Sequence, residues 1–184
     1  MRIFIALASL VLALPASAGD WYASVYGGVN ADNVIDVSFV ESQTGQVVGG
    51  TVGRATPVPG LRIEADVSYR TNDVEVGPLT AVHDTTAVLF NVAYDIDIHD
   101  PVATPYILAG IGYAHTEASV PLLLTLEASD VAFQAGAGIN FKVWPGAKIG
   151  VGYRFLQGPS IEVLGTELSD GSNHSGVAQL TFGL

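Results

Sequence analysis

The sequence has no cysteine, few basic residues and no long apolar run after its first 18 residues. Without cysteine, the chain cannot form disulfides, a Cys-ligated zinc site or a lipid-anchored N-terminal Cys. A membrane-spanning helix needs about 20 consecutive apolar residues, which no later stretch provides. Charged residues make up only 14% of the 184 residues, against roughly 25% in a soluble domain. These absences disfavour a disulfide scaffold, a helical membrane protein and an ordinary soluble domain.

Basic residues are the scarcest charged class. Seven Lys and Arg stand against 18 Asp and Glu, so the formal net charge is −11. Proteins that bind nucleic acid usually carry basic patches, so no nucleic-acid partner is expected. The length suits a single domain.

Residues 1–18 have the three parts of a secretory signal peptide. Arg2 is the positive start, residues 3–14 form an apolar segment of 12 residues, and Ala16-Ser17-Ala18 is a small-residue cleavage site. We therefore expect a signal peptide over 1–18 and one domain over 19–184. Cleavage would remove Arg2 and leave six basic against 18 acidic residues, a net charge of −12.

The rest of the chain alternates apolar and polar residues with a period of two. In residues 61–70 the odd positions are apolar or aromatic, and the even positions are Arg, Glu, Asp, Ser and Arg. A β-strand sends these two sets to opposite faces, whereas a helix would mix them. The pattern predicts an all-β fold with eight strands, over residues 20–31, 45–55, 61–71, 86–98, 105–116, 130–143, 147–157 and 174–184.

The predicted connections alternate between short and long. Residues 56–60, 99–104 and 144–146 form short turns rich in Pro or Gly. The longer connections cover residues 32–44, 72–85, 117–129 and 158–173. This alternation is typical of an up-and-down antiparallel sheet with minimal turns at one end.

Two all-β folds compete for this pattern. A soluble barrel or sandwich buries its apolar face, whereas a transmembrane barrel turns it outward to lipid and keeps a polar interior. The export signal and the aromatic residues near the strand ends favour the transmembrane barrel, because such barrels carry aromatic girdles at both membrane interfaces. The expected girdle residues are Trp21, Tyr69, Tyr94, Tyr113, Phe133, Phe141, Trp144, Phe155 and Phe182.

The polar face predicts the contents of the lumen. An eight-stranded barrel is just wide enough for side chains to fill, and unpaired charges in so narrow a space would be costly. We therefore expect an ion-pair network that plugs the lumen, although a narrow conduit stays an alternative. The expected members are Arg62, Glu64, Asp66, Arg70, Asp95, Asp97, Lys142 and Arg154.

Several strand segments carry a resemblance to a known family. They are Asp20-Trp21-Tyr22 with Gly27-Gly28, and the stretches over residues 105–113, 134–139 and 150–155. The chain resembles the small eight-stranded outer-membrane β-barrels, which include opacity-type surface antigens and porin-family proteins of the OmpA and OmpX kind. The resemblance covers residues 19–184, and its motifs say little about activity.

The resemblance implies a barrel in the outer membrane of a Gram-negative bacterium, and we expect a monomer because a self-closed barrel has no need of partners. Its loops would be extracellular and its termini periplasmic, with outer-membrane lipid and lipopolysaccharide around it. The barrel-assembly machinery would read the C-terminal strand, which keeps apolar alternation in residues 180–184 but ends in Leu184 where the family usually has an aromatic residue.

The long connections hold acidic residues and no Lys or Arg. Acidic loops mostly serve hydration and mutual repulsion, but carboxylates can also ligate divalent cations. No connection has the spacing of a dedicated Ca²⁺ site, and no cofactor is expected. The acidic residues are Asp32, Asp36, Glu41, Asp73, Glu75, Asp84, Glu117, Glu127, Glu162, Glu167 and Asp170.

Three functions remain open. The favoured one is a non-enzymatic barrel with a structural, envelope-integrity or adhesin-like role. The second is a narrow porin-like channel. The third is a lipid A-modifying enzyme, for which only Ser172 and His174, with Glu162 or Glu167, place a nucleophile and base together. The GxSxG and P-loop patterns are absent, which disfavours the enzyme.

Overall fold

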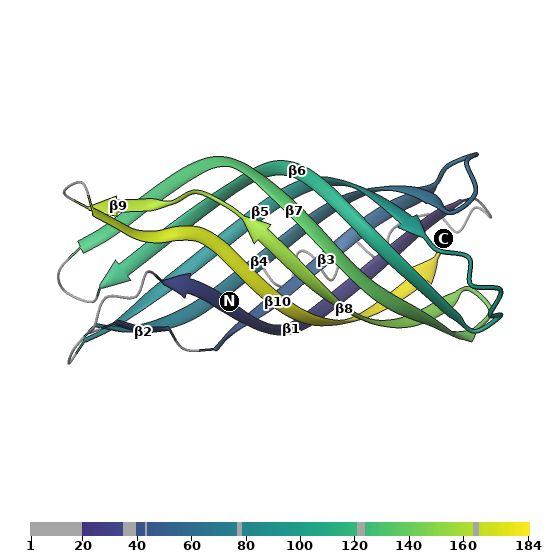
Figure 1. The fold of residues 1–184 in the computed structure, drawn as a ribbon, viewed down its shortest axis with the longest axis horizontal. Helices are drawn as coiled ribbons and strands as arrows, with labels where there is room; N and C mark the ends of the chain where they lie inside the picture. The colour runs from purple at the N-terminus through teal and green to yellow at the C-terminus, as the bar shows by residue number, and fades with distance from the viewer. Residues whose placement is uncertain (1–19, 35–39, 43, 77–78, 121–123, 164–165) are drawn as a thin grey trace.

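The chain folds as one closed antiparallel barrel (Figure 1). The computed structural model describes residues 20–34, 40–42, 44–76, 79–120, 124–163 and 166–184. The barrel wall is made of β1 (Trp21–Val34), β3 (Gly45–Ala55), β4 (Leu61–Val76), β5 (Leu79–Asp95), β6 (Ala103–Val120), β7 (Leu124–Trp144), β8 (Ala147–Gln157) and β10 (Thr166–Gly183). Two short strands, β2 (Val40–Ser42) and β9 (Ile161–Val163), extend the sheet at one end. The predicted signal peptide lies outside the described residues.

Each wall strand pairs with its neighbours along the chain, and β1 pairs with β10 to close the sheet. The closing register runs from Tyr22 opposite Gly183 to Asp32 opposite Asn173. The backbone N–H of Leu184 also donates to the Trp21 carbonyl at 2.9 Å. Closure leaves no sheet edge along this seam, as a lipid-facing sheet requires.

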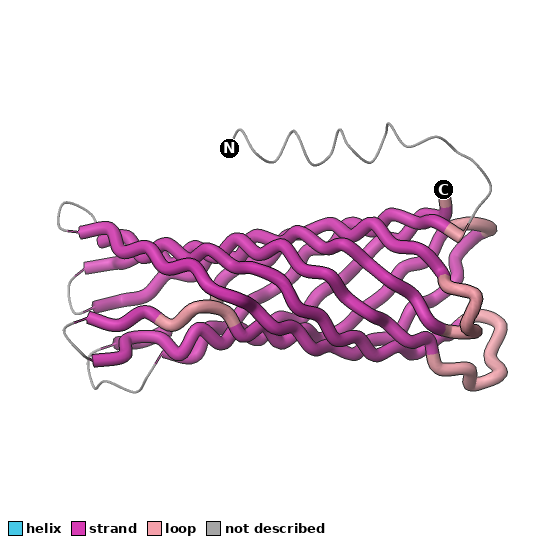
Figure 2. The backbone as a smooth tube through the Cα atoms, turned by 90° about the horizontal axis from the view of Figure 1, so that it is seen from above, coloured by secondary structure: helices cyan, strands magenta, loops and turns pink. Residues whose placement is uncertain are grey.

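The two ends of the barrel differ in construction (Figure 2). At the short-turn end, which also holds Asp20 and Leu184, the strands are joined through residues 56–60, 96–102 and 145–146. At the far end, residues predicted as loops continue as paired strand. The β4–β5 pairing runs to Val76 opposite Leu79, and the β6–β7 pairing runs to Val120 opposite Leu124. The predicted long loops over 72–85 and 117–129 are therefore mostly strand, because cross-strand hydrogen bonding persists where the apolar alternation stops.

The faces of the sheet are inverted relative to a water-soluble barrel. Large apolar side chains such as Val88, Phe90, Ile107 and Val151 are exposed on the outer face. The inner face holds buried charged and polar residues. Within the described residues there is no helix long and apolar enough to cross a membrane.

The outer face changes from apolar to polar at the same level on three adjacent strands. The last apolar row joins β5, β6 and β7 in register, and the next two rows on the outer face are polar. On β7 the apolar band from Phe141 to Val131 spans ten residues, or about 25 Å at about 3.3 Å per residue and about 40° tilt. This height matches the apolar band of a transmembrane barrel. The successive rows are Val88–Tyr113–Val131, Thr86–His115–Ser129 and Asp84–Glu117–Glu127.

A charge on this outer face should destabilise the barrel according to its depth. Ala135 is exposed near the middle of the band on β7, and Val143 is exposed at its short-turn edge. We expect Ala135→Arg to lower the free energy of unfolding in lipid vesicles by about 2–4 kcal/mol, and Val143→Arg by about 0–1 kcal/mol. Urea unfolding of both variants in the same vesicles measures this. Equal losses for the two variants would contradict the placement of the band.

Candidate functional site: the barrel lumen

Asp66 is the centre of the polar interior. It lies on β4, is 0% exposed, and accepts three hydrogen bonds from other strands. Tyr26 Oη donates to Oδ1 at 2.9 Å, while Thr51 Oγ1 and Arg154 Nη1 each donate to Oδ2 at 2.8 Å. Because Arg154 is on β8, its ion pair with Asp66 crosses the lumen and joins strands that are not neighbours in the sheet.

A second charged group lies closer to the short-turn end. Arg62 Nη1 donates to Glu64 Oε1 at 2.5 Å and to Tyr22 Oη at 2.6 Å, and Nη2 donates to Asp95 Oδ1 at 2.8 Å. Tyr22 Oη in turn donates to Glu64 Oε1 at 2.5 Å. One guanidinium is thus held between two carboxylates, which satisfies a buried cation that would otherwise be costly.

The lumen also contains three tyrosines that the sequence analysis did not single out. Tyr22 lies against Gly53, Tyr26 against Gly49, and the Tyr106 hydroxyl lies between Gly138 and Gly152. A Cβ at any of these glycines would collide with the tyrosine ring or hydroxyl. The sequence signal that could have found them is the alternation itself, which places these tyrosines and glycines on the inner face of adjacent or nearby strands. A glycine without a side chain leaves room for the large tyrosine ring opposite it.

Three of the predicted network members form no ion pair with another predicted member among the described residues. Asp97 is 81% exposed in the turn after β5, near His99, because β5 ends at Asp95 and not at residue 98 as predicted. Lys142 is exposed at the short-turn rim, and no carboxylate pairs with it among the described residues. Arg70 is buried, but its hydrogen bond is to Ser68 Oγ at 2.8 Å and no described carboxylate forms an ion pair with it.

Toward the far end, amides and hydroxyls replace the charges. Asn30 Nδ2 donates to Asn173 Oδ1 at 2.8 Å and to Asn72 Oδ1 at 3.1 Å, and Ser175 Oγ donates to Asn30 Oδ1 at 2.6 Å. The opposite wall is lined by a small apolar cluster of Ala87, Leu89, Ala114, Ala132 and Leu156. Side chains from both walls therefore fill this level of the lumen.

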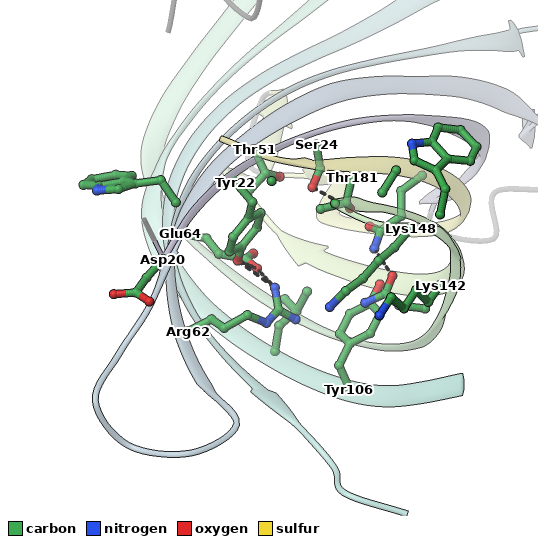
Figure 3. Close-up of a pocket in the computed structure, with 18 of the residues that line it drawn as sticks. Asp20, Tyr22, Ser24, Thr51, Arg62, Glu64, Tyr106, Lys142, Lys148 and Thr181 are labelled. Atoms are coloured by element: carbon green, nitrogen blue, oxygen red, sulfur yellow. Dashed lines mark hydrogen bonds and ion pairs between the residues drawn. The ribbon is translucent and has the colours of Figure 1, made fainter. Parts of the chain in front are cut away.

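At the short-turn end, by contrast, the lumen opens into a cavity of about 340 Å³ (Figure 3). Its walls include Arg62 and Glu64 on one side, Tyr106 below, and Lys142 and Lys148 on the β7–β8 hairpin. Arg154 lines the cavity, so the Arg154–Asp66 pair forms part of its floor. The cavity therefore reaches from the short-turn end to the Arg154 side chain of the central ion pair.

The predicted girdle residues fall into two sets. Seven are exposed on the outer wall: Trp21, Tyr94, Phe141, Trp144 and Phe182 near the short-turn end, and Tyr113 and Phe133 toward the far end. Tyr69 and Phe155 are half-buried, and the Phe155 ring lies 5.2 Å from the His174 ring. The role of these residues at a membrane interface stays a prediction.

Only part of the set of residues considered for catalysis lies within the described residues. Ser172 and His174 lie two residues apart on β10, as expected, and His174 Nδ1 is 2.5 Å from Tyr153 Oη. The side chains of Glu162 and Glu167 lie outside the described residues. These positions leave the enzyme hypothesis untested.

A different Ser–His–Glu set lies on the outer wall. His115 Nδ1 is 2.7 Å from Ser129 Oγ, and its Nε2 is 3.2 Å from Glu117 Oε1. Acyl transfer also needs free backbone N–H groups or other donors for the oxyanion. Here β6 is paired on both sides, with β5 and β7, so its backbone donors belong to the ladder. Nor does the described part of the chain hold a group of three His, Asp or Glu side chains that could bind a metal ion.

The comparison with protein families decides the class of the protein. The family described as "Outer membrane protein beta-barrel domain" matches residues 4–182. The chain belongs to this family. The apolar outer band of this outer-membrane barrel therefore faces lipid, and its inner face is the lumen. None of the curated protein sequences matches the chain.

Solved structures show the same fold for this outer-membrane barrel. Neisserial surface protein A is 17% identical, with a TM-score of 0.68, and the match covers 91% of this chain and 99% of that one. Ail, the attachment invasion locus protein of Yersinia pestis, is 12% identical, with a TM-score of 0.59 and coverage of 90% and 99%. A major outer membrane protein from Thermus thermophilus is 10% identical, with a TM-score of 0.54 and coverage of 88% and 98%.

Breaking the central ion pair should destabilise the barrel strongly. Arg154→Met leaves Asp66 buried without its cation, and such a loss costs about 3–5 kcal/mol. Arg54→Met is the matched control, because Arg54 is half-exposed and lies 3.8 Å from the exposed Asp20. We expect that control to change the free energy of unfolding by about 0–1 kcal/mol. Urea unfolding in vesicles compares the two.

The double variant Asp66→Asn/Arg154→Met tests whether the two side chains act together. It should lose less stability than the sum of the single losses, because the double change removes both members of the pair and leaves neither of them buried without its partner. Strict additivity of the two single changes would contradict the coupling of Asp66 and Arg154.

Proposed function

We propose that this outer-membrane barrel is non-enzymatic and supports envelope integrity or surface contact through its acidic far end. The observation that carries the proposal is the continuation of paired, acidic strands beyond the apolar band. The Asp84–Glu117–Glu127 row lies two rows past the last apolar row and is fixed in register across β5, β6 and β7. Hairpins built in this way present carboxylates at set spacings on a stiff scaffold.

In this proposal the far end is extracellular and the short-turn end, with both strand termini, is periplasmic. Outer-membrane barrels have short periplasmic turns and longer extracellular segments, which matches the two ends of this chain. The acidic row would then stand just above the outer leaflet. Lipopolysaccharide carries phosphate groups, and divalent cations can bridge phosphate to carboxylate oxygens.

The filled lumen supports a structural role over transport. Asp66 and Arg154 join opposite walls, and the amide and alanine–leucine layers occupy the interior beyond them. Arg154 of this ion pair also lines the cavity at the short-turn end. A narrow channel would need a continuous wet path, which these contacts oppose.

Conductance separates the structural proposal from the channel. Because the central layers are filled, the purified barrel in planar bilayers should show no steady conducting steps under an applied voltage. The matched Arg54→Met variant should behave identically, since Arg54 lies outside the lumen. Reproducible steps of fixed size would overturn the plug and favour the channel.

The acidic row should respond to divalent cations when lipopolysaccharide is present. We expect Mg²⁺ to raise the melting temperature of the wild-type barrel in lipopolysaccharide-containing bilayers, and chelation to reverse the rise. Glu117→Gln/Glu127→Gln should lose most of this gain, because both exposed carboxylates are removed from the row. Asp97→Asn, an exposed acid at the other end, is the control. The same Mg²⁺ gain in the double variant would count against the proposal.

A further inference from the structure

The cations of this acidic chain gather around one cavity. After residue 18 the sequence has six Lys and Arg, and four of them line the cavity at the short-turn end: Arg62, Lys142, Lys148 and Arg154. Arg62 is matched by Glu64 and Asp95, and Arg154 by Asp66. The two lysines are therefore the source of uncompensated positive charge in the cavity.

Lys142 and Lys148 are direct cross-strand partners on the β7–β8 hairpin, and both extend into the cavity (Figure 3). Like charges directly opposite one another destabilise a sheet unless something compensates them. Among the described residues neither lysine has an ion pair. The acids that line the cavity are engaged elsewhere, since Glu64 binds Arg62 and Tyr22, and Asp20 lies near Arg54.

The inner wall of the same cavity holds two buried polar atoms without a partner. Tyr106 Oη and Arg154 Nε are both buried and have no hydrogen-bond partner among the described residues. Tyr106 is 3% exposed and Arg154 is 2% exposed. Buried donors are normally satisfied, and leaving them without an acceptor is unfavourable. Gly138 and Gly152 leave the space into which the Tyr106 hydroxyl projects.

We propose that this cavity binds the phosphate group of a phosphate ester. A phosphate monoester carries close to two negative charges, which matches the two uncompensated lysines. Its oxygens are acceptors for the two lysine ammonium groups. A shift of the Tyr106 ring would let them also accept from the Tyr106 hydroxyl and the Arg154 Nε–H, which are closed to solvent in this structure. A volume of about 340 Å³ accommodates a phosphate with a small substituent. The ester is either a free molecule in the periplasm or the headgroup of a lipid at the membrane surface beside Trp144.

The first arm of the test uses a free phosphate ester. The full barrel in a zwitterionic detergent is titrated with glycerol 3-phosphate at constant ionic strength, and the fluorescence of Trp144 is followed in a Trp21→Phe background. We expect a saturable change, and at least about tenfold weaker binding for Lys142→Gln/Lys148→Gln. Tyr106→Phe should also weaken binding. Arg54→Gln, which removes a cation outside the cavity, should bind as the parent does.

The second arm identifies the source of the phosphate. The same titration is run in phosphatidylcholine nanodiscs with and without phosphatidic acid. If the ligand is a lipid headgroup, phosphatidic acid abolishes the response to glycerol 3-phosphate; if it is a free ester, the response persists. Either result supports the site. No saturable response in any arm, or equal binding by Lys142→Gln/Lys148→Gln and Arg54→Gln, would overturn it.

Discussion

The structure depends on the pairing of every backbone N–H and C=O group within the lipid-facing wall. Lipid offers no hydrogen bonds, so the sheet must close on itself, here through β1 and β10. Because side chains alternate along a strand, closure with an apolar outer face points the polar side chains of each strand into the lumen. With eight wall strands that interior is narrow, and most of its charges pair with one another, since an unpaired buried charge is costly. The contact between Asp66 and Arg154 follows from this constraint, as do the tyrosines seated on glycines.

The same wall serves different surroundings along its length. Across the apolar band it meets lipid, and beyond the Tyr113 row it continues as strand with His115 and Glu117 on the outside. The cross-strand backbone pairing continues unchanged past this row, whereas the outward side chains change from apolar to polar. At the opposite end the turns are short and the lumen opens into the lysine-lined cavity. The barrel therefore has a far end with a row of acidic residues on its outer wall and a short-turn end with a lysine-lined cavity, and the central ion pair lies between them.

Period-two alternation predicts eight wall strands and their order, because the side-chain period of a strand is fixed by its backbone. The polar interior follows only when the export signal and the aromatic residues near the strand ends are added. The alternation could not predict where strands end. Alternation reports a difference between two faces, and that difference disappears where both faces meet water. The sequence therefore predicts loops over residues 72–76 and 124–129, which are strand in the structure. The same uncertainty misplaced Asp97, which lies in a turn. The pairing of Asp66 with Arg154 depends on the register of non-adjacent strands, and the inward tyrosines depend on glycines that are distant in sequence.

The most direct test of this account is heat modifiability of the protein in a fractionated outer membrane. A closed barrel stays folded in detergent without boiling and migrates differently once boiled. The account predicts that the protein is found in the outer-membrane fraction and that its migration shifts on boiling. A protein that is soluble in the periplasm and shows no shift would mean that the apolar face points inward, which would contradict both the lipid-facing band and the polar lumen.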